Sequence, residues 1–368
     1  MKGGNSLLIH RMHLDDHYVV LDVNSGAVHI IDKMIYDILG FYDGNNPEET
    51  KAHFKGKYAD SDVEEVLAEL KELQEAGLLF SPDFSVPDTF AEEPILKSLC
   101  LHVAHDCNLR CGYCFADTGD FGGHRALMSK EVAPKAIEFA IKGSKKRHNL
   151  ELDLFGGEPL MNMPVVKFIV DYVRKREKET GKNIKLTLTT NGTLLTDEIV
   201  TYLNDNRVML VLSLDGSKKT HDHMRPYPGH LGSFDKAVDK EYEKLARIYL
   251  DKRRKGIPFD FFHFNVALDN GPCVAKRLAG CGAGHEYYAI TPEGDIYPCH
   301  QFVGREQYKM GTLDMGIVKK DMVQYFRHMH VMKKEECRTC WARFFCSGGC
   351  HANADLVNGT IEKPYEYG

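Results

Sequence analysis

The sequence lacks a long apolar run, an excess of basic residues and an apolar segment at its N-terminus. No stretch of its 368 residues approaches the ~18 consecutive apolar residues that would span a bilayer. Lysine and arginine total 47 against 53 aspartate and glutamate, so no basic surface is available for a phosphate backbone. The N-terminus has no apolar core of a signal peptide. We therefore expect a soluble, cytoplasmic protein with neither a membrane nor a nucleic-acid partner.

The N-terminal residues predict a small independent unit. Residues 1–82 contain three short strand patterns followed by three helical patterns, a winged-helix-like order. A turn is expected at residues 24–26, and Ser61 with Glu64 predicts a capping box for the third helix. The proline-rich segment 83–95 is the expected linker.

Residues 96–270 alternate strand and helix patterns, which favours an α/β fold with a parallel sheet of βα units. The predicted strands are 96–103, 151–155, 185–190 and 208–214, and the predicted helices are 129–145, 164–178, 196–204 and 234–245. The motifs CNLRCGYC, GGEP, TNG and SLDG each follow one strand, so they should converge on one rim. Too few residues precede Cys273 for a full barrel, so we expect either a partial barrel or a chain that lacks residues there.

The eleven cysteines are an odd number, and without an export signal they indicate metal or redox chemistry rather than a disulfide framework. Cys100 lies within a predicted strand and is expected to be a buried core thiol. Apart from Cys100 and Cys273 the cysteines are grouped: Cys107, Cys111 and Cys114; Cys281 and Cys299; and Cys337, Cys340, Cys346 and Cys350.

The first group places three thiolates on one short loop. Cys107, Cys111 and Cys114 could hold three corners of an iron-sulfur cube and leave the fourth iron open. The alternative is a redox or zinc site, for which His105 could provide a fourth ligand.

The segment CNLRCGYCF, including Tyr113 before its last cysteine, resembles the signature of the radical S-adenosylmethionine (SAM) enzymes. Further residues match that family in order: Gly156, Gly157 and Glu158 its SAM-binding GGE motif, Ser213 its ribose-contacting serine, and Arg225 the arginine that holds the methionine carboxylate. The resemblance implies a [4Fe-4S] cluster on the three cysteines whose open iron binds SAM. It also implies reductive cleavage of SAM to a 5'-deoxyadenosyl radical, which abstracts hydrogen from carbon.

The C-terminal cysteine spacing, within residues 271–368, resembles the SPASM extension of peptide-modifying radical SAM enzymes. That resemblance implies two auxiliary clusters, hence three [4Fe-4S] clusters in all: cluster I on Cys281, Cys299 and Cys350, and cluster II on Cys337, Cys340 and Cys346. The fourth ligand of cluster I is left open between Cys273, a substrate cysteine and none. The seventh cysteine of the family pattern, expected for cluster II, is absent from this chain. A zinc ribbon is the alternative.

The unit at residues 1–82 resembles the PqqD-like leader-recognition domains, which add an extended peptide to a sheet edge. The alternative is a DNA-binding winged helix, which a dense basic helix would favour and this unit lacks. The domain order most resembles the thioether maturases of short six-cysteine (SCIFF) peptides. It implies a partial (β/α)6 barrel, a precursor peptide as substrate, and an electron donor such as flavodoxin or ferredoxin. Two rival functions are a sulfatase-type maturase, from whose pattern His300 departs, and a zinc-stabilised peptide or DNA binder without catalysis.

Overall fold

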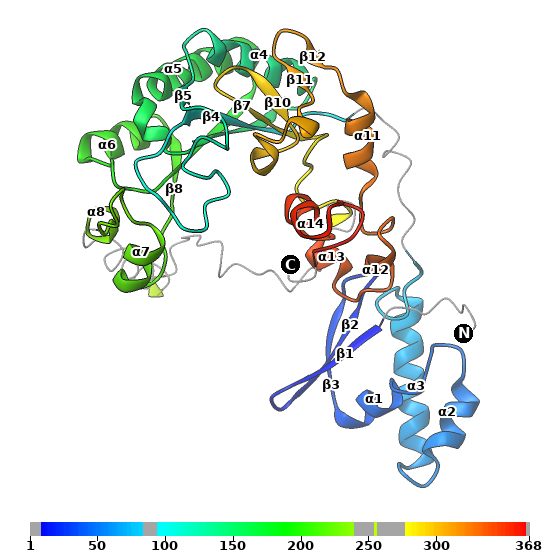
Figure 1. Cartoon of the computed structure of the whole chain (residues 1–368). Coiled ribbons are helices and arrows are strands. Elements are labelled where there is room, and N and C mark those ends of the chain that lie inside the picture. Colours follow the sequence, from blue (N-terminus) through cyan, green and yellow to red (C-terminus); the bar gives the residue numbers. More distant parts are fainter. Residues whose placement is uncertain (1–8, 84–93, 239–253, 256–276, 366–368) are drawn as a thin grey trace. The chain divides into compact units, whose positions relative to one another are not determined.

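The computed structural model describes residues 9–83, 94–238, 254–255 and 277–365, and the chain divides into two compact units (Figure 1). One comprises the described parts of Met1–Glu92, Asp260–Gly280 and Met329–Gly368. The other comprises those of Glu93–Phe259 and Cys281–His328. The last four cysteines therefore fold with the N-terminal domain, whereas Cys281 and Cys299 fold with the large sheet.

The N-terminal domain has the predicted order of three strands and then three helices. Its elements are β1 (Ile9–Leu14), β2 (His17–Asp22), β3 (Val28–Ile31), α1 (Lys33–Ile38), α2 (Pro47–Phe54) and α3 (Asp60–Glu75). The strands form an antiparallel sheet in the order β1-β2-β3. One sheet face packs Val20 against a core from all three helices, including Ile38, Phe54 and Leu70.

Two local predictions for this domain have opposite outcomes. The turn at residues 24–26 is confirmed, because Asp22 Oδ1 accepts from the backbone N–H of Ser25 at 2.8 Å and Gly26 has a φ of 76°. The capping box is wrong. Helix α3 begins at Asp60, and Ala59 at the cap position makes no side-chain hydrogen bond. Ser61 therefore lies inside the first turn, where Asp60 and Asp62 place negative charge at the positive end of the helix dipole.

The second unit contains the predicted parallel strands in one sheet, which confirms the α/β fold class. They are β4 (Ser98–His105), β6 (Asn149–Gly156), β7 (Asn183–Thr190) and β8 (Val208–Leu212), adjacent in that order. The helices are α4 (Val132–Gly143), α5 (Met163–Thr180), α6 (Asp197–Asp205), α7 (Lys218–Met224) and α8 (Phe234–Val238), and β5 (Ala126–Leu127) pairs with β4. The predicted continuation of the last helix to residue 245, and the remaining barrel units, lie outside the described residues.

The same sheet continues into the C-terminal part of the chain. Strand β9 (Tyr287–Ile290) pairs in parallel with β4, followed across the sheet by β10 (Asp295–Tyr297), β11 (Gly311–Thr312) and β12 (Gly316–Ile317). Helix α11 (Lys320–His328) ends this unit. In the other unit the last cysteines lie on or beside three short helices: α12 (Glu335–Arg338), α13 (Arg343–Cys346) and α14 (His351–Asn358).

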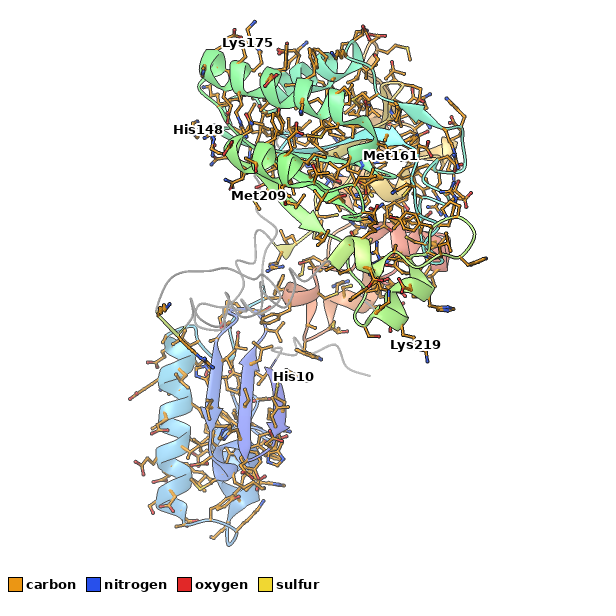
Figure 2. All side chains as sticks on the ribbon, turned by 90° about the vertical axis from the view of Figure 1, so that its left-hand side faces the viewer. His10, His148, Met161, Lys175, Met209 and Lys219 are labelled. Atoms are coloured by element: carbon orange, nitrogen blue, oxygen red, sulfur yellow. The ribbon has the colours of Figure 1, made fainter. Side chains whose placement is uncertain are left out.

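Alternate residues of the parallel strands separate a helix-packed core from a polar inner face. Leu99 and Leu101 of β4 join the large apolar core with residues of α4 and α5. Cys100 and His102 lie on the opposite face and are buried there, as expected for a Cys100 core thiol. Strand β8, at one end of the described sheet, exposes Met209 (Figure 2). None of the described helices is both long and apolar enough to cross a bilayer.

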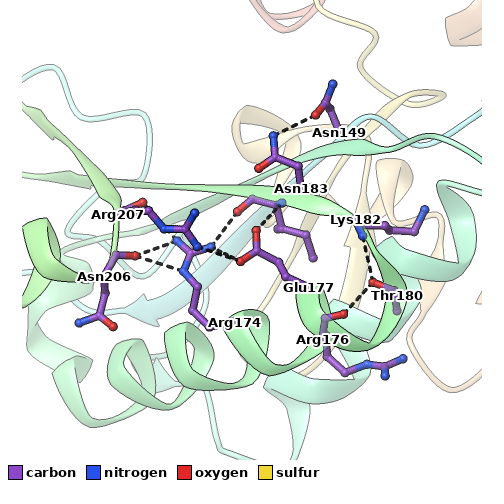
Figure 3. Close-up of polar contacts among 10 residues, drawn as sticks. Asn149, Arg174, Arg176, Glu177, Thr180, Lys182, Asn183, Asn206 and Arg207 are labelled. Carbon is purple, nitrogen blue, oxygen red and sulfur yellow. Dashed lines mark hydrogen bonds and ion pairs between the residues drawn. The ribbon is translucent and has the colours of Figure 1, made fainter.

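Hydrogen bonds connect the end of α5 to the beginning of β7 and to the turn before β8 (Figure 3). The Arg174 guanidinium donates to the carbonyls of Asn206 at 2.8 Å and Ile184 at 3.1 Å, and it pairs with Glu177 at 2.8 Å. Glu177 also accepts from the Ile184 N–H at 2.8 Å. This network holds the amino ends of the strands, opposite the rim that carries the motifs.

Candidate active site

The four motifs follow the carboxyl ends of four adjacent strands, as predicted. The cysteine loop follows β4, GGEP follows β6, TNG follows β7 and SLDG follows β8. The Ser213 N–H donates to the carbonyl of Thr190 at 3.0 Å, which joins the last two loops. The motifs therefore meet on one rim of the sheet.

The GGE glycines let the loop after β6 approach the loop after β4. A Cβ on Gly156, whose φ is 135°, would lie 2.1 Å from the carbonyl oxygen of Ala104, and one on Gly157 would lie 2.2 Å from that of Asp106. In their place the Gly157 N–H donates to Ala104 and the Glu158 N–H to Asp106, both at 2.8 Å. Glycine is thus required here for close approach between two segments of the chain itself.

Glu158 is fully buried and holds the TNG loop. Its carboxylate accepts from the Thr190 hydroxyl at 2.6 Å and from the backbone N–H groups of Asn191 at 2.8 Å and Leu160 at 3.1 Å. Burial raises the pKa of Glu158 despite these bonds. Direct contact between Glu158 and the amino group of SAM remains a prediction.

Donors that the sequence analysis did not identify surround Cys107. Asn191 directs its amide nitrogen at the Cys107 sulfur, 3.8 Å away, and at Asn108 Oδ1, 2.9 Å away. The Leu109 N–H lies 3.4 Å from the same sulfur. Burial raises the pKa of the Cys107 thiol to about 11, and the Leu109 N–H acts in the opposite direction. Such donors stabilise a sulfur that becomes negatively charged when it binds metal.

Tyr113 and Arg225 lie together, joined by Asp215 of the SLDG motif, to which the sequence analysis assigned no role. The Tyr113 hydroxyl donates to Asp215 Oδ2 at 2.6 Å, and Arg225 Nε lies 3.1 Å from the same oxygen. The guanidinium carbon is 5.3 Å from the centre of the Tyr113 ring. Burial raises the pKa of Cys111 and the Arg225 charge opposes that shift, so this cation faces the cysteine loop.

Backbone hydrogen bonds tie the cysteine loop to the segment that carries Arg225. The Arg110 N–H donates to the carbonyl of Pro226 at 2.7 Å, and the Gly112 N–H donates to that of Met224 at 2.9 Å. The loop is therefore held on one side by GGE and TNG and on the other by the end of α7.

The inner face of the sheet carries buried polar groups among aromatic rings. His102 Nδ1 lies 3.0 Å from His105 Nε2, so these two histidines contact each other. On β9, the Tyr287 hydroxyl lies 3.0 Å from Nδ1 of His300. Burial lowers the pKa of His300 to about 4, so its imidazole is neutral near pH 7. The Phe155 ring lies 5.1 Å from that of His300.

In the other unit, three of the last four cysteines lie near a buried lysine. Lys334 is 2% exposed and donates to the carbonyl of Gly348 at 3.0 Å. Burial lowers the pKa of Lys334, whereas the charges of the thiolates of Cys337, Cys346 and Cys350 act in the opposite direction. The assignment of Cys350 to cluster I remains a prediction, and in this unit Cys350 shares the surroundings of Lys334 with two of the cysteines expected for cluster II.

Two domain families match this arrangement. Residues 101–254 match the Radical SAM superfamily, and residues 281–341 match SPASM, an iron-sulfur cluster-binding domain. The chain carries a radical SAM domain and a SPASM domain.

The names of similar proteins describe several activities. A cysteine-type anaerobic sulfatase-maturating enzyme of Clostridium novyi is 27% identical over 73% of this chain and 92% of its own. The radical SAM cyclopropyl synthase TigE of Paramaledivibacter caminithermalis is 26% identical over 46% of this chain, which spans only 38% of that protein's length. The structure of native anSMEcpe with bound AdoMet has the same fold, with a TM-score of 0.56, 19% identity, and coverage of 73% of this chain and 93% of that one.

The residues of the radical SAM loop fit a [4Fe-4S] cluster. Cys107, Cys111 and Cys114 are free, half-buried thiols on one loop, and Cys107 faces two N–H donors. Among the described residues, no three Cys, His, Asp or Glu side chains are grouped as ligands of a single metal ion. A cubane, by contrast, offers each thiolate a separate iron.

The three cysteines near Lys334 also fit an iron-sulfur cluster, for a different reason. The ammonium of Lys334 is buried beside three thiols, and a buried charge is stabilised by a neighbouring opposite charge. An iron-sulfur cluster with thiolate ligands carries net negative charge. Cys281 and Cys299 belong to the other unit, so the complete ligand set of each auxiliary cluster, and the count of three clusters, remain predictions.

Proposed function

We propose that this chain is a radical SAM peptide maturase that forms intramolecular thioether crosslinks in a ribosomally made precursor peptide. The observation that carries the proposal is the closed rim around the cysteine loop. At one edge of the sheet this rim contains the three thiols and the Arg225–Asp215 pair. It also contains the hydrogen-bonded contact between the GGE loop and the cysteine loop, which we call the GGE clamp. The same chain carries a SPASM domain and an N-terminal sheet whose edge strands, β1 and β3, pair with no further strand among the described residues.

When bound, the first cluster and SAM supply a 5'-deoxyadenosyl radical that removes a hydrogen atom from an unactivated carbon. In the net reaction a C–H bond and the S–H bond of a cysteine break, and one C–S bond forms. The carbon's hydrogen leaves in 5'-deoxyadenosine and the thiol hydrogen as a proton. SAM is the two-electron oxidant and is reduced to methionine and 5'-deoxyadenosine. One electron from a donor is needed to begin the cleavage of SAM, and formation of the thioether releases one electron, so no reductant is consumed overall.

The residues of this chain have separate tasks in that reaction. Arg225 is the proposed partner of the SAM carboxylate, and Asp215 with Tyr113 holds its guanidinium in place. Glu158 holds the rim closed through Thr190 and the TNG backbone. We propose that flavodoxin or ferredoxin in the cytoplasm supplies the priming electron.

The proposed peptide partner docks on the N-terminal domain by adding a strand to its sheet. The edge strand β3 carries the exposed apolar residues Val28 and Ile30, whereas on the other edge strand His10 is stacked on Trp341. His29 of β3 lies 3.0 Å from the carbonyl of Leu78, just after α3, so a helix flanks this edge. These contacts favour β3 as the docking edge. The fold neighbour anSMEcpe has also been solved with a bound peptide, Cp18Cys.

A second candidate function is sulfatase maturation, favoured by the relative from Clostridium novyi that covers 73% of this chain. The two functions differ in product. Oxidation of a cysteine to formylglycine removes its sulfur, whereas a thioether retains the sulfur and removes two hydrogens.

The test uses the full chain purified without oxygen and analysed for iron and sulfide. We expect about 12 iron atoms per chain for three cubanes, formation of 5'-deoxyadenosine from SAM and dithionite, and a loss of two hydrogens from a SCIFF-type six-cysteine peptide used as probe. The matched control replaces Cys107, Cys111 and Cys114 with Ala and should retain only auxiliary iron. A zinc-loaded chain that cleaves no SAM would overturn the proposal. Loss of sulfur from a cysteine peptide would favour sulfatase maturation.

A further inference from the structure

The ammonium of Lys334 has no carboxylate partner within the described part of the chain. Its only direct protein hydrogen bond there is to the carbonyl of Gly348, at 3.0 Å. Lysine is rarely buried without a partner, because the charge loses its hydration. The neighbouring Lys333 is exposed. The side chain of Lys334 is therefore buried individually, and not because the whole segment is buried.

The groups around that ammonium become anionic only when they bind metal. Gly348 lies between Cys346 and Cys350, and a Cβ on Gly348 would be 3.6 Å from Lys334 Nζ. Cys337 follows one helical turn after Lys334, and its N–H donates to the Lys334 carbonyl at 3.1 Å. Free thiols are neutral near pH 7, whereas metal-bound cysteines are thiolates. The missing countercharge is thus supplied by metal loading of these cysteines.

We propose that Lys334 is a positioning residue for the redox chemistry of the SPASM domain, whose positive charge raises the reduction potential of the cluster held by this cysteine segment. The inference rests on the part of the proposed function that places an iron-sulfur cluster here, and not on thioether formation. Reduction adds one negative charge to the cluster, and a nearby cation inside the protein stabilises that charge because screening by water is weak there.

The decisive variant is Lys334→Gln, which removes the charge and keeps a donor for the Gly348 carbonyl. Lys333→Gln is the matched control, because it removes the same charge from an exposed position that water and salt screen. Both are made in the full chain with Cys107, Cys111 and Cys114 replaced by Ala, so that only auxiliary clusters give a signal. A redox titration followed by electron paramagnetic resonance reports the ratio of reduced to oxidised cluster.

At the potential where one auxiliary cluster of the parent is half reduced, we expect Lys334→Gln to lower the reduced-to-oxidised ratio about tenfold, a shift of about 59 mV for one electron. Lys333→Gln should leave the ratio unchanged. An unchanged ratio in a Lys334→Gln protein with full iron content overturns the inference, since hydrogen bonding to Gly348 would then be the whole role of the side chain.

The unfolding temperature gives a second readout, because the substitutions should change it in opposite directions without and with iron. Without iron, Lys334→Gln and Lys334→Met should raise the unfolding temperature, because a buried unpaired charge is removed. With iron loaded, both should lower it. A decrease in both states would identify a purely structural lysine and overturn the inference. If Lys334→Gln shifts the reduced-to-oxidised ratio but no thioether forms in the activity assay, the proposed role of Lys334 still holds. If Cys340→Ala loses no iron, both that role and the assignment of a cluster to this segment are overturned.

Discussion

The guanidinium of Arg343 lies 2.7 Å from the carboxylate of Asp83, which connects the segment between Cys340 and Cys346 to the end of the N-terminal domain. Arg343 also donates to the side chain of Asn24, in the turn between β2 and β3. It is 2% exposed, although it carries a full charge.

Two further contacts reinforce this connection. His10 of β1, labelled in Figure 2, stacks on Trp341 with ring centres 4.1 Å apart. Leu21 of β2 shares a small apolar core with Cys337 and Phe344. The proposed leader-binding sheet and the last cysteines therefore form one folded unit.

Replacement of Arg343 should weaken both parts of that unit. Arg343→Met removes the charged hydrogen bonds to Asp83 and Asn24, and we expect a loss of about 1–3 kcal/mol in the free energy of unfolding. Iron bound by the auxiliary cysteines should fall in parallel, as measured by denaturant titration and iron analysis. Arg338→Met, on an exposed residue of the same segment, is the control. Lost stability with unchanged iron retention would show that the two parts are independent.

A second prediction concerns the GGE clamp. Gly157→Ala places a methyl group 2.2 Å from the carbonyl oxygen of Asp106, so the loop after β6 must move away from the cysteine loop. We expect loss of the first cluster and at least a hundredfold fall in 5'-deoxyadenosine formation, measured by chromatography after anaerobic reconstitution. Gly123→Ala is the control, because its Cβ would meet only the Asp120 carbonyl at 3.4 Å, an ordinary contact. Full activity in Gly157→Ala would contradict the clamp.

The local patterns predicted much of this fold. The strand expected at 96–103 is β4, Ser98–His105, in which Leu99 and Leu101 alternate with the inward-facing Cys100 and His102. The convergence of the four motifs followed from parallel strands alone. The capping box predicted for α3 was wrong. Ser61 and Glu64 match its sequence pattern, but the helix begins one residue earlier, at Asp60, so Ser61 is not the N-cap.

Long-range relationships could not be predicted in this way. The pairing of β9 with β4 joins segments far apart in the chain, and no local pattern encodes it. Asp215 was part of a recognised motif, but its contacts with Tyr113 and Arg225 depend on how three loops meet. Lys334 would ordinarily be assigned to the surface, since lysine is among the least buried residues.

A third prediction concerns the pH dependence of the N-terminal domain. Lys33, Lys57 and the Tyr58 hydroxyl donate to Asp37 at 2.5, 2.8 and 2.7 Å, and they hold the pKa of its carboxyl well below the usual range. Folding therefore favours the ionised form, and the stabilisation is present above about pH 4 and lost as the pH falls further.

Asp37→Asn should accordingly lower the unfolding temperature of the iron-free chain at pH 7. The difference from the parent should shrink towards pH 2, as followed by circular dichroism. Glu65→Gln, on the exposed side of α3, should have little effect at either pH. A difference that stays constant from pH 7 to pH 2 would mean that the charge of Asp37 is not what stabilises the domain.

The choice of docking edge gives the last prediction. Ile30 on β3 is 76% exposed and Leu14 on β1 is 57% exposed, so the most exposed apolar side chains of the two edge strands can be compared. If the leader adds to β3, Ile30→Glu places a charge against it and should weaken its binding at least tenfold, whereas Leu14→Glu should change affinity less than twofold. Fluorescence anisotropy with a labelled SCIFF-type leader measures both. The reverse pattern would assign the leader to β1, where it would have to displace the contact between His10 and Trp341.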